Sequence, residues 1–139
     1  LGIHVLINRG VRLSYCGAPL WLAGVDDMEE GQVDLAAALD GRHPDEPAVV
    51  MSHHPDVFVS SQAHGVDLTL SGHTHGGQIR LGPIEPIQHS AHGWLSGLYH
   101  SDGCHLQVTS GVGATKLPIR LGTQAEVPIL ELQPPSADR

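Results

Sequence analysis

Three histidines follow two apolar runs of the sequence, and their spacing suits the binding of metal ions. His73 and His75 follow the run at residues 66–71, after Gly72. On an extended backbone, side chains at positions i and i+2 point to the same face. His53 follows the run at residues 47–52 in the same way. If the two runs are neighbouring parallel strands, the three imidazoles converge beyond their carboxyl ends, where ligands collect in α/β folds. Histidine nitrogens suit Zn, Mn, Fe or Ni, so we expect a metal site there.

The residues beside these histidines are compatible with a metal site, but they do not show which histidines are its ligands. Gly72, Gly76 and Gly77 flank the second pair and permit close backbone approach and unusual φ angles. His54 adjoins His53 and points the opposite way on an extended chain, so we expect only one of the two to be a ligand. The spacing alone does not decide which one it is.

The sequence offers no clear carboxylate ligands and several histidines with ordinary roles. A hydrolytic metal pair normally has carboxylates beside its histidines, but the available aspartates lie in no obvious ligand pattern: Asp26, Asp27, Asp56 and Asp67. Three histidines alone could instead hold a single catalytic zinc with an open position. The other histidines occur singly, and we expect surface or hydrogen-bonded structural roles for them: His4, His43, His64, His89, His92, His100 and His105.

Composition indicates one acidic domain with an aliphatic core. The 139 residues are 40% hydrophobic but only 4% aromatic, so Leu, Val, Ile and Ala must form the core. The formal charge of −8 disfavours general nucleic-acid binding, although bound cations would reverse the field locally. Cys16 and Cys104 form no CxxC pattern, and two free core thiols are favoured over a disulfide. No apolar run approaches the ~18 residues of a membrane-spanning helix.

The elements before the first histidine are expected to be short strands and one helix. Residues 3–8 and 11–15 are predicted to form a hairpin or two successive strands, and residues 20–24 are a third apolar run. A D-x-x-E capping box at residues 27–30 precedes apolar residues at helical spacing. We therefore expect a helix over residues 28–40.

The histidine-bearing region and the last third are predicted to be mainly β. Residues 47–52 and 66–71 have the continuous apolar character of strands buried on both faces, with a short helix over residues 56–61 between them. Residues 94–100 and 105–110 are expected to pair through an Asp-Gly turn. Further expectations are a strand beginning at residues 79–81, a proline-rich loop at 82–88, an irregular glycine-rich segment at 111–121 and an edge strand at 127–132.

Two motifs resemble those of a known family. Ser-His-His-Pro-Asp at residues 52–56 and Gly-His-Thr-His-Gly-Gly-Gln at residues 72–78 resemble the last two motifs of calcineurin-like metallophosphoesterases. The second motif is most similar to one branch, the bacterial phosphohydrolases like YkuE and YaeI. Gly-Leu-Tyr at residues 97–99 and Ser-Gly-Val-Gly at residues 110–113 are also similar to that branch.

The resemblance implies a metal-dependent phosphoester hydrolase with a dinuclear centre. His53 and His73 would bind one metal and His75 the other, with the metals about 3.5–4 Å apart and a bridging hydroxide that attacks phosphorus. His54, at the variable position of the first motif, and Thr74 are expected to contact substrate. The cofactors would be two divalent ions among Mn, Zn, Fe and Ni. The substrate would be a phosphoester, either a small molecule or lipid-linked.

The same resemblance implies that this chain is part of one domain. The N-terminal motifs of the family, D-x-H, G-D-x-x-D and G-N-H-[DE], do not occur in the sequence, so the catalytic residues are expected in a half that precedes it. Residues 1–132 would be the C-terminal half of an α/β (α+β) domain, a four-layer α/β/β/α sandwich, β-rich with few helices. Residues 133–139 would be a polar tail. We expect such a half to expose apolar surface and to self-associate.

Several expectations remain alternatives at this point. The isolated chain is expected to be inactive and could be a non-catalytic metal-binding or assembly module, or a single-zinc hydrolase of another class. The branch suggests a bacterial cytoplasmic or membrane-associated protein, anchored through an N-terminal segment. Residues 122–126 lack the arginine–proline pair that the branch tends to show, and we expect that loop to lie outside the metal site.

Overall fold

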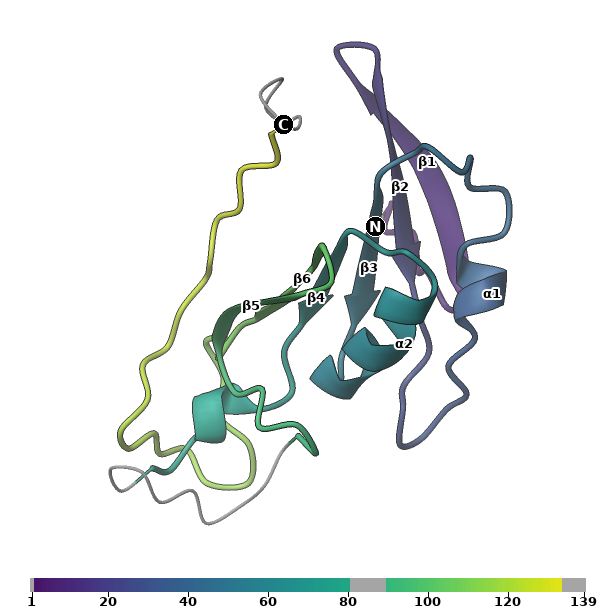
Figure 1. Ribbon diagram of the computed structural model, residues 1–139. Coiled ribbons are helices and arrows are strands. Elements are labelled where there is room, and N and C mark those ends of the chain that lie inside the picture. Colours follow the sequence, from purple (N-terminus) through teal and green to yellow (C-terminus); the bar gives the residue numbers. More distant parts are fainter. Residues whose placement is uncertain (1, 81–89, 134–139) are drawn as a thin grey trace.

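A six-stranded mixed sheet forms the frame of the computed structural model, which describes residues 2–80 and 90–133 (Figure 1). Few and short helices accompany it, so the fold is α/β, as the sequence predicted. The strands are β1 (Arg9–Tyr15), β2 (Ala18–Gly24), β3 (Ala48–Ser52), β4 (Leu68–Ser71), β5 (Gly97–Ser101) and β6 (Cys104–Val108). The helices are α1 (Leu35–Ala38), α2 (Phe58–Ala63) and the 3₁₀ turns η1 (Pro55–Val57) and η2 (His75–Gly77).

The strand order, β1-β2-β3-β4-β6-β5, places the two histidine-bearing strands side by side in the middle of the sheet. β2, β3, β4 and β6 run parallel to one another, and β1 and β5 close the edges as antiparallel strands. Val50 pairs with Ala23 on one side and with Thr69 on the other. Parallel pairing brings the carboxyl ends of β3 and β4 to the same edge, as the sequence predicted.

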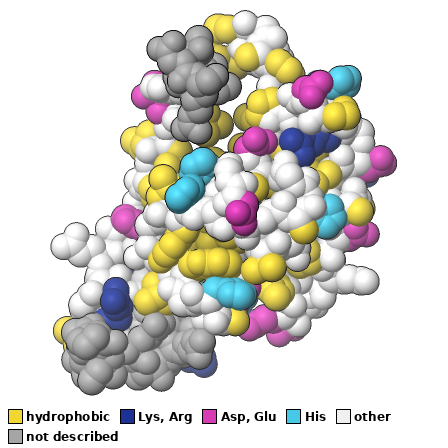
Figure 2. Space-filling model, viewed as in Figure 1, with side chains coloured by type: hydrophobic (Ala, Val, Ile, Leu, Met, Phe, Trp, Pro, Cys, Tyr) yellow, Lys and Arg dark blue, Asp and Glu magenta, His cyan; other side chains and the backbone are white. Residues whose placement is uncertain are grey.

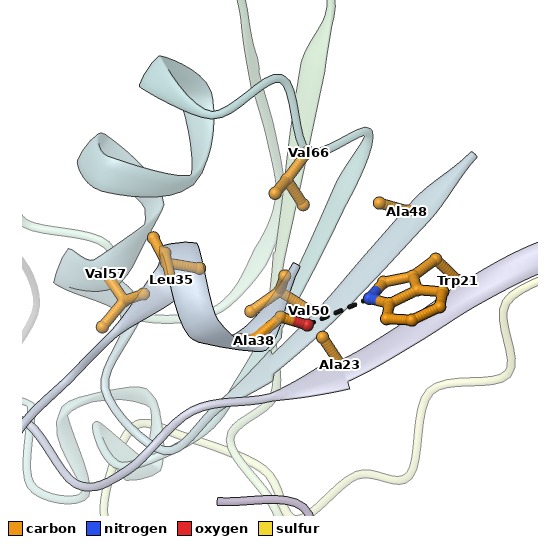
Figure 3. Packing of buried hydrophobic residues seen from close by; sticks show 8 residues of the cluster. All are labelled: Trp21, Ala23, Leu35, Ala38, Ala48, Val50, Val57 and Val66. Carbon is orange, nitrogen blue, oxygen red and sulfur yellow. Dashed lines mark hydrogen bonds between the residues drawn. The ribbon is translucent and has the colours of Figure 1, made fainter. Parts of the chain in front are cut away.

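The helices cover one face of the sheet and bury its core there (Figure 1). Trp21 and Val50 pack against Leu35 and Ala38 of α1, and the Trp21 indole donates a hydrogen bond to the Ala38 carbonyl at 3.0 Å (Figure 3). A second cluster gathers around Phe58 of α2. It comprises Phe58, Cys104, Leu106 and Val108, with Trp94 and Tyr99 packed against it.

The other face of the sheet is apolar but only partly buried. Val11, Leu13, Met51 and Leu98 alternate with the helix-facing side chains of their strands, and they are between 38% and 62% exposed. Figure 2, seen from the same side as Figure 1, shows that hydrophobic side chains also reach the surface in that view. The exposed apolar surface agrees with the sequence expectation, while self-association stays a prediction.

Two predicted strands are wrong, and both lie near the ends of the chain. Residues 3–8 form no strand, because Asn8 has a φ of 49° and turns the chain; the hairpin is β1–β2 instead. Residues 127–132 are irregular, and Ile129 is 94% exposed. Ile79 makes a single bridge to Leu121, and the prediction for residues 81–88 lies outside the described residues.

The predicted helix over residues 28–40 is shortened to the four residues of α1. The capping interaction forms, since Asp27 Oδ1 accepts the Glu30 N–H at 2.8 Å, but it closes only a turn. Asp34 then acts as a new N-cap by accepting the Ala37 N–H at 2.9 Å. Side-chain acceptors therefore replace helical backbone bonds over the first part of the predicted helix.

The cysteines are both free, as expected, but only Cys104 is buried. Burial raises the pKa of the Cys104 thiol. Cys16 is exposed at the β1–β2 turn, so its predicted place in the core is wrong. Within residues 2–80 and 90–133, no helix has the length and apolar character needed to cross a bilayer.

Phe58 should dominate the stability of the second cluster. The side chain is 1% exposed and its ring meets that of Trp94 edge-on at 5.4 Å. We expect Phe58→Ala to lower the free energy of unfolding by about 3–5 kcal/mol, because it leaves a cavity in the core. Val59→Ala, on the 47% exposed neighbour, should change it by less than ~0.5 kcal/mol. Urea unfolding followed by circular dichroism measures both, and equal effects would contradict this packing.

The carboxylate of Glu46 should make the free energy of unfolding depend on pH in the acidic range. The carboxylate is almost fully buried and accepts hydrogen bonds from Arg12 Nε and Nη2 at 2.8 and 3.0 Å. The Arg12 hydrogen bond is the main cause that lowers the pKa of Glu46. This stabilisation is present above the unfolded-state pKa and is lost as pH falls through the lower folded-state pKa. Glu46→Gln should therefore be less stable than wild type at pH 7 and converge with it in acid, as urea unfolding at several pH values would show.

Candidate metal centre

The backbone at the ends of β3 and β4 is fixed by serines and a glycine. Ser52 pairs with Ser71 in the last register position of the two strands. The Ser52 hydroxyl donates to the His54 carbonyl at 2.9 Å, and the Ser71 hydroxyl reaches the same oxygen at 3.5 Å. The Gly72 N–H donates to the His53 carbonyl at 3.2 Å. These bonds tie both histidines of the first motif to the start of the second.

The structure brings three of the predicted site histidines together. His53 Nε2 lies 3.1 Å from His73 Nδ1, with the two rings edge to face at 4.9 Å. The His54 ring lies 4.1 Å from that of His73. Two nitrogens bound to one zinc at about 2.0–2.1 Å and a tetrahedral angle would be roughly 3.4 Å apart. The separation of His53 and His73 therefore fits either a hydrogen bond or two ligands of one cation.

A carboxylate that the sequence interpretation missed approaches the same histidines. Ligand atoms of Glu29, His54 and His73 all lie within 4.8 Å of one another. Glu29 was interpreted only as part of a capping segment, because nothing in its spacing links it to a histidine motif. The available signal was the density of carboxylates at residues 26–30, and only the tertiary structure shows which of them faces the histidines.

His75 lies in a tight left-handed turn outside that group. The expectation that His73 and His75 share a face of an extended strand is wrong, because β4 ends at Ser71 and their φ angles are 68° and 50°. The Nδ1 atom of His75 is buried without a hydrogen-bond partner. Among the described residues the three-ligand group does not include His75, and metal binding by all three predicted histidines stays a prediction.

The loop at residues 122–126 contacts this turn through the backbone of His75 and Gly76, and the expectation that it lies outside the metal site stays a prediction. Thr123 Oγ1 donates to the His75 carbonyl at 3.4 Å, and Arg120 Nη1 donates to the same oxygen at 3.3 Å. Gly76 has a φ of 63°, and a Cβ there would lie 2.4 Å from Thr123 Oγ1. The glycine is therefore required both by its conformation and by the close approach of the loop. A Cβ at Gly72 would make only ordinary contacts, so the same need does not apply there.

The two residues predicted to contact substrate are held inside the fold. Thr74 is fully buried, and its hydroxyl donates to the Leu95 carbonyl at 2.5 Å and accepts the Gly76 N–H at 3.3 Å. A substrate could reach that hydroxyl only after these bonds break. His54 is 9% exposed. Substrate contact by His54 and Thr74 stays a prediction.

Of the aspartates considered as possible ligands, Asp67 has a structural role, whereas Asp27 and Asp56 lie near the histidines. Asp67 accepts the Ala48 N–H at 2.7 Å and has a structural role. The Glu30 and Glu29 backbone N–H groups lower the pKa of Asp27, and the nearby His53 and His54 lower it further. Asp56 Oδ2 lies 3.9 Å from His54 Nδ1.

Other histidines have the ordinary contacts that were expected. His64 Nδ1 lies 2.8 Å from the Ser60 carbonyl oxygen, and the His92 ring stacks on Trp94 at 4.6 Å. His100 faces His105 across the β5–β6 pair, with ring centroids 6.0 Å apart. His89 lies outside the described residues.

An α/β sheet with imidazoles and a carboxylate gathered beyond parallel strand ends defines a candidate metal-binding domain. The chain is 35% identical over 150 residues to a Bos taurus protein named "Transmembrane protein with metallophosphoesterase domain". The alignment covers 96% of this chain and 33% of that protein, so the chain spans about a third of the relative's length. This similarity supports the metallophosphoesterase superfamily. No family model and no solved structure matches the chain.

Gly76→Ala should lower the free energy of unfolding more than the same substitution at another glycine with a left-handed backbone. Gly65 has the same φ of 63° with open space around its Cβ position, which makes Gly65→Ala a matched control. Both changes cost about 1–2 kcal/mol for the left-handed backbone. Gly76→Ala should cost about 1–3 kcal/mol more, because its Cβ collides with Thr123. Urea unfolding compares the variants, and equal losses would show that the loop does not constrain the turn.

Proposed function

We propose that this chain supplies histidine ligands to the dinuclear metal centre of a metal-dependent phosphoester hydrolase. The observation that carries the proposal is the approach of His53 Nε2 to within 3.1 Å of His73 Nδ1 beyond the ends of two parallel strands. The similarity to a protein with a metallophosphoesterase domain supports the reaction class. The resemblance of both histidine motifs to calcineurin-like metallophosphoesterases, in particular the YkuE- and YaeI-like branch, points to the same reaction class.

The chain's own residues would bind and orient the metals. His53 and His73 would hold one divalent ion and His75 a second, with Mn, Zn, Fe and Ni all compatible with imidazole nitrogens. When bound, such a pair activates water for attack on phosphorus and neutralises charge in the transition state. The buried Nδ1 of His75, which has no hydrogen-bond partner, fits a residue that awaits a ligand. The serine bonds to the His54 carbonyl keep the first motif against the second.

The remaining parts of the centre are proposed to come from outside this chain. The aspartate, asparagine and further histidine ligands implied by the resemblance belong to motifs that the sequence lacks. They would come from an N-terminal half of the same four-layer domain, packed on the exposed apolar face, and the isolated chain would be inactive. The substrate would be a phosphoester, small or lipid-linked, rather than a specific nucleic acid. Membrane association would depend on a separate N-terminal segment, and the exposed face would let isolated chains self-associate.

Two other functions would differ from the proposed one in metal content or in hydrolytic activity. A non-catalytic metal-binding or assembly module would bind metal without hydrolysis. A single-zinc hydrolase of another class would bind one equivalent of zinc and leave phosphoesters intact. The proposed phosphoesterase requires two equivalents in the complete domain together with hydrolysis of a generic aryl phosphate.

Loss of His53 or His73 should abolish turnover by the complete domain. We expect His53→Ala and His73→Ala to lower hydrolysis of p-nitrophenyl phosphate by more than about 100-fold, since even the loss of an outer-shell partner costs 10–100-fold. His105→Ala is the control, because that side chain is exposed on β6 and faces another surface histidine, His100. Metal content is measured in parallel by elemental analysis. Unchanged turnover in either histidine variant would refute the proposal.

A further inference from the structure

The loop that carries Glu29 is fixed in place beside the histidines. Asn8 Oδ1 accepts the N–H groups of Asp26 and Asp34, each at 3.0 Å, and so closes the two ends of the loop. Asp27 Oδ1 accepts the Glu29 N–H at 2.8 Å inside it. The side chain of Glu29 is 67% exposed at this position, so it is available to a ligand.

His54 is buried beside this loop with an unsatisfied ring. It is 9% exposed, and its Nδ1 has no hydrogen-bond partner. Its Nε2 lies 3.8 Å from Glu29 Oε1, and its Nδ1 lies 3.9 Å from Asp56 Oδ2. Both distances are too long for hydrogen bonds. The ring therefore lies between two carboxylates without a hydrogen bond to either.

A cation between Glu29 and His54 would satisfy this arrangement. Metal-bound histidines usually donate their other ring N–H to a carboxylate, and the Asp56 carboxylate is the one nearest to Nδ1 of His54, at 3.9 Å. Asp56 is itself held by the Ala91 N–H at 2.8 Å and by the Ser90 hydroxyl at 2.5 Å. The His54 ring therefore has the held carboxylate of Asp56 on one side and the carboxylate of Glu29 on the other.

We infer that Glu29, His54 and His73 form a binding site for one divalent cation of the zinc class. Their ligand atoms converge from three separate segments to within 4.8 Å of one another. Two imidazoles and one carboxylate are a donor set that zinc takes with a fourth position open to water. An exposed Glu–His ion pair would explain only two of the three residues, and such pairs stabilise little.

Two of the three residues of this site, Glu29 and His54, are not metal ligands in the proposed phosphoesterase centre. The site shares His73 with that centre but requires neither His53 nor His75, and it does not depend on hydrolysis. Glu29 and His54 are therefore the residues that separate the two proposals, and His53 is the residue that tests the other one.

Titration of the 139-residue chain with Co²⁺, followed by visible absorption and calorimetry, tests the inference. We expect one equivalent to bind, and Glu29→Gln and His54→Ala to weaken binding about 10-fold or more. Glu30→Gln is the matched control, since it removes the same charge from the same loop and lies outside the three-ligand group. Glu30→Gln should retain one bound equivalent. Circular dichroism of each variant verifies that the chain remains folded.

The opposite results separate the two proposals. Binding by Glu29→Gln that equals Glu30→Gln, or the absence of Co²⁺ binding by wild type, overturns the inference. If His53→Ala and His73→Ala then lose binding while Glu29→Gln does not, the proposed phosphoesterase centre stands alone. If folded His73→Ala also binds Co²⁺ as wild type does, both proposals fail.

Discussion

The parallel pairing of β3 and β4 is the constraint on which the candidate site depends. Because both strands run in the same direction, their carboxyl ends reach one edge of the sheet, and the residues that follow them must meet there. The register fixes Ser52 opposite Ser71, and the serine hydroxyls then hold the His54 carbonyl. An antiparallel pairing would send the two motifs to opposite edges and leave their imidazoles apart.

The end of β4 is followed by a turn whose backbone angles differ from those of an extended strand. His73 and His75 both adopt left-handed backbone conformations, which cost free energy for side chains with a Cβ. The loop around Arg120 and Thr123 compensates by binding the His75 carbonyl. Strained residues held by surrounding structure are common at functional sites, so this turn is consistent with a ligand-binding role.

The acidic residues acquire different roles through position. Glu46 and Asp67 are used by the fold, through Arg12 and the Ala48 N–H respectively. Asp27 organises its loop, and Glu29 in that same loop faces the histidines. The net negative charge of the chain therefore includes carboxylates placed where a cation would be stabilised by more than the imidazoles alone.

The face of the sheet opposite the helices is apolar, and no second layer of the described residues fully covers it. Side chains such as Leu13 and Met51 are aliphatic yet remain about two-fifths exposed. A sheet in an α/β protein is normally covered on both faces, because its strands are apolar on both. The exposed layer is therefore physically consistent with a domain in which further structure packs on this side.

The sequence by itself determined the central strands, the β5–β6 hairpin and the meeting of His53 with His73, because apolar runs of strand length and an Asp-Gly turn are local signals. It misplaced the strand at residues 3–8, because Asn8 binds Asp26 and Asp34 through contacts far apart in the chain. It began the helix too early, because Asp34 caps it just before Leu35. It also predicted a strand at residues 127–132, where the structure is irregular. Only the tertiary structure decided that His75 lies in a left-handed turn and that Glu29 approaches His54, since neither spacing nor propensity encodes contacts between separate loops.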